Sequence, residues 1–202
     1  IAGAFKPDEG KIEIDGIDVT NMPEHKRAAY LGRVFQDPMK GTAPDLTIEE
    51  NLSLACNQTK RFPLALAVQK KDLAYYREQL SAFRMGLEDR MKMKVGLLSG
   101  GQRQAVTLLM ATLKKPKLLL LDEHTAALDP KTAEKVLEIT EKIVTERNLT
   151  TVMITHNMRD AIAYGNRLIM MYNGRVVVDV SGEEKKKLTV EQLMELFSKA
   201  SR

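Results

Sequence analysis

The spacing of apolar residues along the chain predicts a series of short strands. Lys11–Gly16 alternates polar and apolar residues before a turn, which is typical of a half-buried antiparallel strand. Leu118–Asp122 is instead apolar until its last residue, as expected for a strand of a parallel sheet that is covered on both faces. Four further strands are predicted at Val34–Pro38, where the proline ends the strand, at Thr150–Thr155, at Arg167–Tyr172 and at Val176–Val180.

Helices are predicted between these strands. Thr47 and Glu50 form a T-x-x-E capping box that opens one helix, and Asp129-Pro130 places an N-cap before a proline in the first position of another. The other helices are predicted in Asp72–Arg84, in Gln102–Leu113, in Met158–Tyr164 and after the Thr189/Gln192 cap, and the charge run Glu183–Lys187 is predicted to be a solvated turn. Because strands alternate with helices, we predict an α/β fold with a mostly parallel sheet and helices on both of its faces.

Composition narrows the class of protein. Hydrophobic residues make up 44% and charged residues 29% of the 202 residues, which is typical of a folded domain and argues against a disordered chain. A single cysteine, Cys56, excludes an internal disulfide. The net charge of +4 is small and dispersed, so it does not indicate a nucleic-acid-binding protein.

Three segments carry candidate chemistry. Ser99-Gly100-Gly101-Gln102 opens a helix with an S-x-x-Q capping box, and a hydroxyl with backbone N–H groups at a helix N-terminus can bind phosphate. Asp122-Glu123 follows the apolar strand, where a carboxylate can hold Mg²⁺ together with its waters. His156 follows the Thr150–Thr155 strand, at the end where open α/β sheets bind ligands. Taken singly, these residues could equally be a helix cap, a solvated loop and a structural histidine.

In this order and spacing, the segments resemble the ATP-binding-cassette (ABC) ATPases. The matching positions are Gln36, the signature segment Leu98–Gln102, the Walker B pair Asp122-Glu123, the Ala127-Leu128-Asp129 segment and His156. The resemblance implies a P-loop NTPase-like core, a helical subdomain that carries the signature segment, and a partial antiparallel β subdomain. It assigns 1–38 and 115–202 to the catalytic core and 39–114 to the helical subdomain of a single ABC ATPase domain.

The resemblance also implies a role for each position. Asp122 and Gln36 would hold Mg²⁺, Glu123 would polarise the attacking water, and His156 would contact the γ-phosphate of ATP. The residues implied in nucleotide binding are Gln36, Ser99, Gly100, Gly101, Gln102 and Asp129. In the family, the signature segment faces the ATP held by a partner subunit, so two copies of the chain would enclose two nucleotides.

The cofactors implied are therefore ATP and Mg²⁺. The implied partners are a second copy of the chain, transmembrane permease subunits and, indirectly, a substrate-binding protein, with no nucleic acid. The family places such a subunit at the cytoplasmic face of the cell membrane. We expect the permease to dock on the segment after Gln36, around Met39, Leu46, Ile48 and Asn51.

The family's phosphate-binding motif, G-x-x-x-x-G-K-[ST], does not occur in the 202 residues. In the family, that loop and its helix come directly before a segment similar to Ile1-Ala2-Gly3. We therefore expect the P-loop and its strand to lie upstream of Ile1, and these 202 residues to be inactive by themselves.

Departures from the common family pattern suggest a branch. His124 stands where the family usually has proline, and Ala105 and Met110 stand where arginines are usual. The Asp-Glu-His-Thr-Ala-Ala-Leu-Asp string resembles bacterial importers of amino acids, with tryptophan or tyrosine as candidate cargo. The leading interpretation is therefore the ATP-hydrolysing subunit of a membrane importer. The alternatives are an exporter or lipoprotein-release ATPase, a non-transport ABC ATPase acting on DNA or ribosomes, and a nucleotide-binding regulator that does not hydrolyse ATP. His25 and His124 are given no catalytic role.

Overall fold

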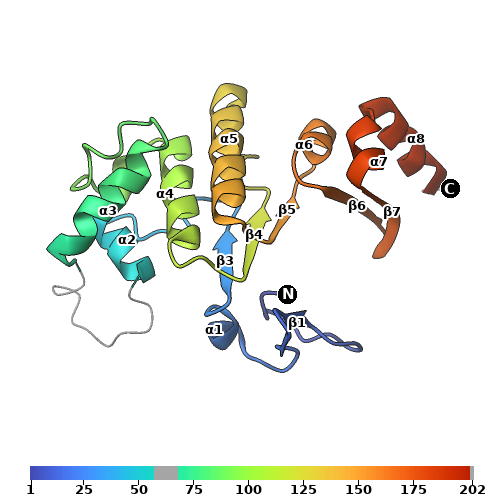
Figure 1. Cartoon of the computed structure of the whole chain (residues 1–202), viewed down its shortest axis with the longest axis horizontal. Coiled ribbons are helices and arrows are strands. Elements are labelled where there is room, and N and C mark those ends of the chain that lie inside the picture. Colours follow the sequence, from blue (N-terminus) through green and yellow to red (C-terminus); the bar gives the residue numbers. More distant parts are fainter. Residues whose placement is uncertain (57–67, 201–202) are drawn as a thin grey trace. The chain divides into compact units, whose positions relative to one another are not determined.

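The computed structural model describes residues 1–56 and 68–200, and the chain divides into two compact units, Ile1–Met153 and Ile154–Arg202. In the first unit, the elements are β1 (Glu13–Ile14), β2 (Ile17–Asp18), α1 (Glu24–Arg27), β3 (Leu31–Val34), α2 (Ile48–Cys56), α3 (Lys70–Ser81), α4 (Gly100–Thr112), β4 (Leu118–Asp122), α5 (Pro130–Arg147) and β5 (Thr151–Ile154), as drawn in Figure 1. The second unit contains α6 (Met158–Ala163), β6 (Arg167–Tyr172), β7 (Arg175–Ser181), α7 (Gly182–Lys187) and α8 (Val190–Ala200). The α/β fold predicted from the sequence is confirmed.

A sheet in the order β3-β4-β5 forms the centre of the first unit. β3 and β4 run parallel, with Leu31 opposite Leu118 and Val34 opposite Leu121. The backbone N–H of Leu119 donates to the carbonyl of Thr150, next to β5, at 2.9 Å. Leu119 and Leu121, which share one face of β4, are fully buried, whereas Leu118 and Leu120 on the other face are half-buried, so the predicted complete burial of both faces is not observed.

Helix α4 packs against β3, α2 and α5 (Figure 1). The contact with β3 is close at Gly32, where a Cβ atom would lie 2.3 Å from the carbonyl oxygen of Ala111. No side chain fits between strand and helix at this point, so glycine is required. The core around them combines residues from β3, β4 and the helices, among them Val34, Leu52, Leu108 and Ile139.

Several predicted strands differ from the observed ones. The strand predicted at Val34–Pro38 is shifted, because β3 ends at Val34, before Gln36. The strand predicted at Thr150–Thr155 is observed as β5, Thr151–Ile154. It is the last strand of the three-stranded sheet, and its Val152 and Ile154 are 42% and 54% exposed. The antiparallel strand predicted at Lys11–Gly16 is reduced to the two residues of β1, paired with β2.

In the second unit, β6 and β7 form an antiparallel pair, as the Asn173-Gly174 turn predicts. Leu168, Val178, Val180 and Leu193 form its core. The predicted solvated turn at Glu183–Lys187 is wrong, because these residues belong to α7. Lys185 is buried there, and its ammonium group donates to the carbonyl oxygens of Ile162 and Tyr164. Within the described part of the chain, no helix has both the length and the apolar character needed to cross a membrane.

Candidate functional site

The Walker B pair lies where β4 ends. Asp122 is the last residue of the strand and is half-buried. Glu123 follows with a φ of 44°, in the left-handed region that residues other than glycine seldom adopt. Such a backbone costs on the order of 1–3 kcal/mol and is found preferentially at active sites and switch segments. The chain therefore turns sharply at two adjacent carboxylates, at the C-terminal end of the central strand β4.

Gln36 lies at the same edge. The register places Val34 opposite Leu121, so Phe35 and Asp122 are the next residues of two neighbouring parallel strands. Gln36 follows directly and is exposed. The guanidinium of Arg33 lies 4.4 Å from the centre of the Phe35 ring, a cation–π contact that holds this strand end. Gln36 thus lies two residues beyond the paired end of β3, which neighbours the end of β4 that carries Asp122.

The signature segment caps α4 as predicted. Ser99 is the N-cap: its Oγ accepts a hydrogen bond from the Gln102 backbone N–H at 3.3 Å, and its own N–H donates to Gln102 Oε1 at 3.2 Å. The side-chain amide of Gln102 also donates to the carbonyl oxygen of Met85 at 3.3 Å. Both ends of this amide are bound within the chain, so Gln102 stabilises the first turn of α4 through the capping box.

The two glycines of the signature segment pack against the Asp129 segment. A Cβ atom on Gly101 would lie 2.1 Å from Thr132 Cγ2, and one on Gly100 would lie 3.2 Å from Leu128 Cδ2. Asp129 caps α5 by accepting a hydrogen bond from the Thr132 N–H at 3.1 Å. Hydrogen bonding from the Thr132 side chain, and then from its backbone, holds the pKa of the Asp129 carboxyl below its ordinary value. The signature segment therefore packs on Leu128 and Thr132, which lie on either side of Asp129 in the sequence.

His156 belongs to the second unit and is exposed in the turn that follows β5. The turn is shaped by two local hydrogen bonds, from the Asn157 N–H to Thr155 Oγ1 at 3.0 Å and from the Arg159 N–H to Asn157 Oδ1 at 3.0 Å. Partial burial raises the pKa of the nearby Asp160 carboxyl, and the charge of His156 opposes that rise.

The residues at the C-terminal ends of β3 and β4 carry ligand atoms of the kind that bind Mg²⁺. Asp122 and Gln36 offer carboxylate and amide oxygens, which are the donors that Mg²⁺ prefers. Across the described residues there is no cluster of three or more His, Cys, Asp or Glu side chains that could form a metal cage.

His124 is buried in the loop that follows Glu123. It is 2% exposed, and its Nε2 lies 3.1 Å from the hydroxyl oxygen of Thr140 on α5. Burial lowers the pKa of this imidazole from 6.5 to about 4. The side chain is therefore neutral at pH 7, and it fastens the loop after Glu123 to α5.

Part of the predicted docking segment is wrong, because Ile48 and Asn51 are fully buried. The Asn51 side chain accepts from the Ala43 N–H at 2.8 Å and donates to the carbonyl oxygens of Ala43 and Thr47 at 3.0 and 2.9 Å. Asn51 thus holds the loop that follows Gln36. Met39 is 43% exposed, so this residue remains available to a partner.

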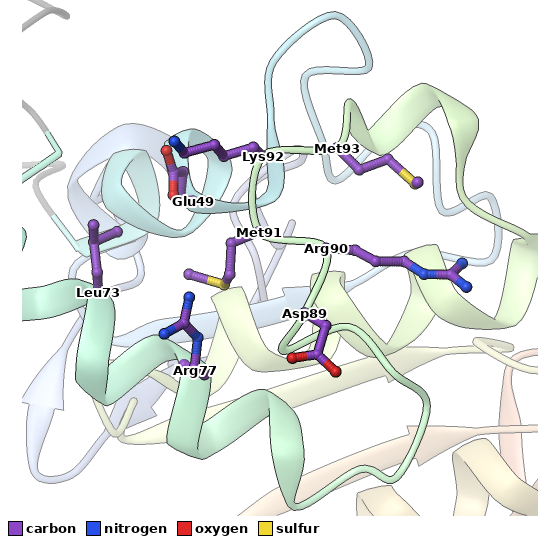
Figure 2. A pocket seen from close by; sticks show the side chains of 8 residues that line it. All are labelled: Glu49, Leu73, Arg77, Asp89, Arg90, Met91, Lys92 and Met93. Carbon is purple, nitrogen blue, oxygen red and sulfur yellow. The ribbon is translucent and has the colours of Figure 1, made fainter.

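A groove lies beside this loop, away from Asp122 and Glu123. It has a volume of about 420 Å³, and Figure 2 shows Met91 between Glu49 of α2 and Arg77 of α3. Its remaining lining residues are Leu73, Asp89, Arg90, Lys92 and Met93. The Glu49 N–H donates to the carbonyl oxygen of Met91 at 3.0 Å, so the two walls of the groove are hydrogen-bonded to each other.

Sequence reasoning missed two residues that follow the signature segment. Arg103 donates from Nη2 to the carbonyl oxygen of Gly96 at 2.9 Å and from Nε to that of Val95 at 3.2 Å. Gln104 is fully buried and donates from Nε2 to the carbonyl oxygen of Phe35 at 3.1 Å. A polar residue with a long side chain on the buried face of a predicted helix was the signal for Gln104.

The chain is similar to a known family and to named proteins. The family described as "ABC transporter" matches residues 1–126. A protein of Clostridioides difficile (strain R20291) named "Tyrosine transport ATP-binding protein" is 48% identical over 202 residues, which cover 99% of this chain and 79% of that protein. The "Thiamine import ATP-binding protein ThiQ" of Photobacterium profundum is 32% identical, covering 96% and 77% of the two chains.

Solved structures give the same result. The dimeric, post-hydrolysis ATP-binding cassette MJ0796, bound to ADP and Pi, superposes with a TM-score of 0.71 at 30% identity and covers 90% of this chain and 77% of that one. CbiO1 from Clostridium perfringens, part of the ABC transporter complex cbiONQ, superposes with a TM-score of 0.75 over 96% of this chain and 74% of that one. At 23% identity, the second likeness shows the fold alone.

Proposed function

This chain belongs to the ABC transporter family, and from that premise we propose that it is the ATP-hydrolysing subunit of an amino-acid importer. One observation supports the proposal: the paired strand ends of β3 and β4 lead into Gln36 and into Asp122-Glu123, and the signature glycines pack on Leu128 and Thr132, around Asp129. The 48% identity to a tyrosine transport ATP-binding protein supports an amino acid as the cargo.

The proposed chemistry is hydrolysis of ATP. Glu123 would polarise and orient the attacking water, because a carboxylate at the strand end can accept its proton. Asp122 and Gln36 would hold Mg²⁺, which when bound neutralises charge on the phosphates. His156 would donate a hydrogen bond to the γ-phosphate oxygens.

The signature segment is proposed to act on the nucleotide of a second copy of this chain. Ser99, Gly100 and the first N–H groups of the 13-residue α4 form a helix N-terminus, which attracts phosphate. Gly101 and Gln102 would shape that surface, through close packing on α5 and through the capping box. Asp129 would lie at the same junction between the two copies.

Transmembrane permease subunits are the proposed partner at the groove of Figure 2, and a substrate-binding protein would act through them. The groove combines the half-buried apolar side chains of Leu73 and Met93 with charged side chains of both signs, a surface suited to an amphipathic helix. One wall contains Glu49 in the first turn of α2, the helix that follows the loop after Gln36. We propose accordingly that the protein works at the cytoplasmic face of the membrane.

The docking proposal is tested by disulfide crosslinking of the assembled transporter, with Cys56 replaced by serine. Arg77→Cys and Lys92→Cys should crosslink to cytoplasmic loops of the permease. Lys199→Cys, at the end of α8, serves as the matched control. Crosslinks that form only from position 199 would overturn the assignment of the groove.

Hydrolysis is tested in the protein as its own gene encodes it. Glu123→Gln should retain ATP binding and lose hydrolysis by about a hundredfold or more, because charge and positioning around the water dominate phosphoryl transfer. Asp122→Asn should instead weaken Mg²⁺-dependent nucleotide binding. Glu138→Gln removes an exposed carboxylate from α5 and should leave both properties unchanged. Normal turnover by Glu123→Gln would remove Glu123 from its proposed role.

Two further measurements address the finer proposals. The 202 residues contain no G-x-x-x-x-G-K-[ST] string, so by themselves they should not bind ATP with micromolar affinity in a calorimetric titration. Deleting the gene should abolish uptake of labelled tyrosine or tryptophan while leaving thiamine uptake intact. Loss of thiamine uptake alone would refute the proposed cargo.

A further inference from the structure

A side chain of α4 binds the main chain directly before Gln36. Because α4 begins at the signature segment, we call it the signature helix. Phe35 is the residue between the end of β3 and Gln36, and its carbonyl oxygen accepts a hydrogen bond from Gln104 Nε2 at 3.1 Å. Gln104 lies in the second turn of α4, five residues after Ser99. A single side chain thus spans from the helix that begins at the signature segment to the strand end that carries Gln36.

The environment of Gln104 is unusual for an amide. The side chain is fully buried, and its neighbours along α4, Ala105, Val106 and Leu108, are buried and apolar. Within the described residues, Gln104 Oε1 is buried with no hydrogen-bond donor. An unsatisfied buried acceptor costs about 1–3 kcal/mol, so an apolar side chain would suit stability better at this position. The position of the donor nitrogen offers a reason for an amide here.

The loop after Gln36 is fastened to the same segment. Backbone N–H groups of Gly96 and Val95 donate to the carbonyl oxygens of Pro44 and Leu46 at 2.8 and 2.9 Å. Arg103 binds the carbonyl oxygens of Val95 and Gly96 and lies against the sulfur of Met39. The chain on both sides of Gln36 is therefore tied to the residues around Ser99.

We infer that Gln104 is a positioning residue for Gln36: its buried amide fixes the strand end that carries Gln36 and couples it to the signature helix. The inference rests on the proposed ATPase function, in which Gln36 contacts the metal and the attacking water. Gln104 itself touches neither. Its loss should displace Gln36 and slow the chemical step without weakening the binding of ATP.

The test is Gln104→Met in the protein as its own gene encodes it. Methionine keeps the length and volume of the side chain and removes the donor to Phe35 together with the unpaired acceptor. We expect kcat to fall about tenfold or more at a nearly unchanged KM for ATP, because small displacements of positioning groups slow chemistry by such factors. In a Gln36→Ala background, Gln104→Met should have almost no further effect on kcat, since its action runs through Gln36.

Thr112→Val is the matched control. Thr112 is also fully buried on α4, but its hydroxyl bonds only to carbonyl oxygens of the same helix, of Leu108 and Leu109. It should leave kcat unchanged. An unchanged kcat in Gln104→Met, or an equal loss in the Gln36→Ala background, would overturn the inference.

If Gln104→Met does not fold, Gln104→Glu preserves the side-chain shape and replaces the donor with a carboxylate oxygen. An unchanged kcat in Gln104→Glu, or an equal loss of kcat in the Gln36→Ala background, would then overturn the inference. Failure of both variants to fold would show that the amide is only structural. Wild-type protein that hydrolyses no ATP would refute the proposed function instead, and the two failures are therefore distinguishable.

Discussion

The buried imidazole of His124 makes stability depend on pH in a defined direction. Its pKa is lowered to about 4 in the folded chain, against 6.5 for an exposed imidazole, because burial penalises the charged form. Between these values the unfolded chain binds the additional proton, so the free energy of unfolding falls as the pH decreases from 6.5 to 4. At about 1.4 kcal/mol per pH unit, the loss amounts to about 3 kcal/mol in total and about 2 kcal/mol by pH 5. Above pH 6.5 this group causes no change.

Urea unfolding followed by far-ultraviolet circular dichroism, between pH 7.5 and pH 5, measures this effect. His124→Gln keeps polar atoms near Thr140 but cannot titrate. Between pH 7.5 and pH 5, its free energy of unfolding should therefore fall by about 2 kcal/mol less than that of the wild type. His25→Gln removes an exposed imidazole and is the matched control, with a profile that follows the wild type. Parallel profiles for His124→Gln and the wild type would refute the reasoning.

Two substitutions test the packing that surrounds the site. Gly32→Ala would place a Cβ atom 2.3 Å from the Ala111 carbonyl oxygen, a backbone atom, and should destabilise the fold by about 2–3 kcal/mol in urea unfolding; a change below about 0.5 kcal/mol would contradict this close approach. Asn51→Leu leaves the Ala43 N–H without its acceptor and should expose the 43–47 loop to limited proteolysis. Asn21→Leu, which changes an exposed asparagine, should not. Equal protease resistance in both variants would show that Asn51 does not hold this loop.

The sequence was most informative where a local rule coincides with the fold. The Ser99 capping box and the N-cap at Asp129 follow from the chemistry of helix ends, and both are confirmed. The Leu118–Asp122 strand was evident because an uninterrupted apolar run suits a buried parallel strand. These three elements place Ser99, Asp129, Asp122 and Glu123.

Features that depend on distant neighbours could not be read from local patterns. Ile48 and Asn51 follow a correctly predicted cap, but tertiary packing buries both of them. The charges of Glu183–Lys187 suggested a solvated turn, whereas backbone carbonyls of Ile162 and Tyr164 bury the Lys185 ammonium in a helix. The bond from Gln104 to Phe35 spans 69 positions and has no local signature.

The division of the chain into a 39–114 helical subdomain and a core remains a prediction, as do the roles of the individual site residues. The boundary between the two compact units falls between Met153 and Ile154, a different position that reflects packing within each part. The chemical roles require nucleotide to be tested.

The central claim is that Glu123 drives hydrolysis at a site that the signature segment of a second copy completes. Size-exclusion chromatography with light scattering, on the protein as its own gene encodes it, tests both parts in one measurement. With Mg-ATP, Glu123→Gln should elute as a dimer that retains two nucleotides, and without nucleotide it should elute as a monomer. Adding Ser99→Arg, which places bulk and charge at the exposed N-cap of α4, should abolish that dimer. A Glu123→Gln protein that stays monomeric with Mg-ATP, or a dimer that persists with Ser99→Arg, would contradict the account.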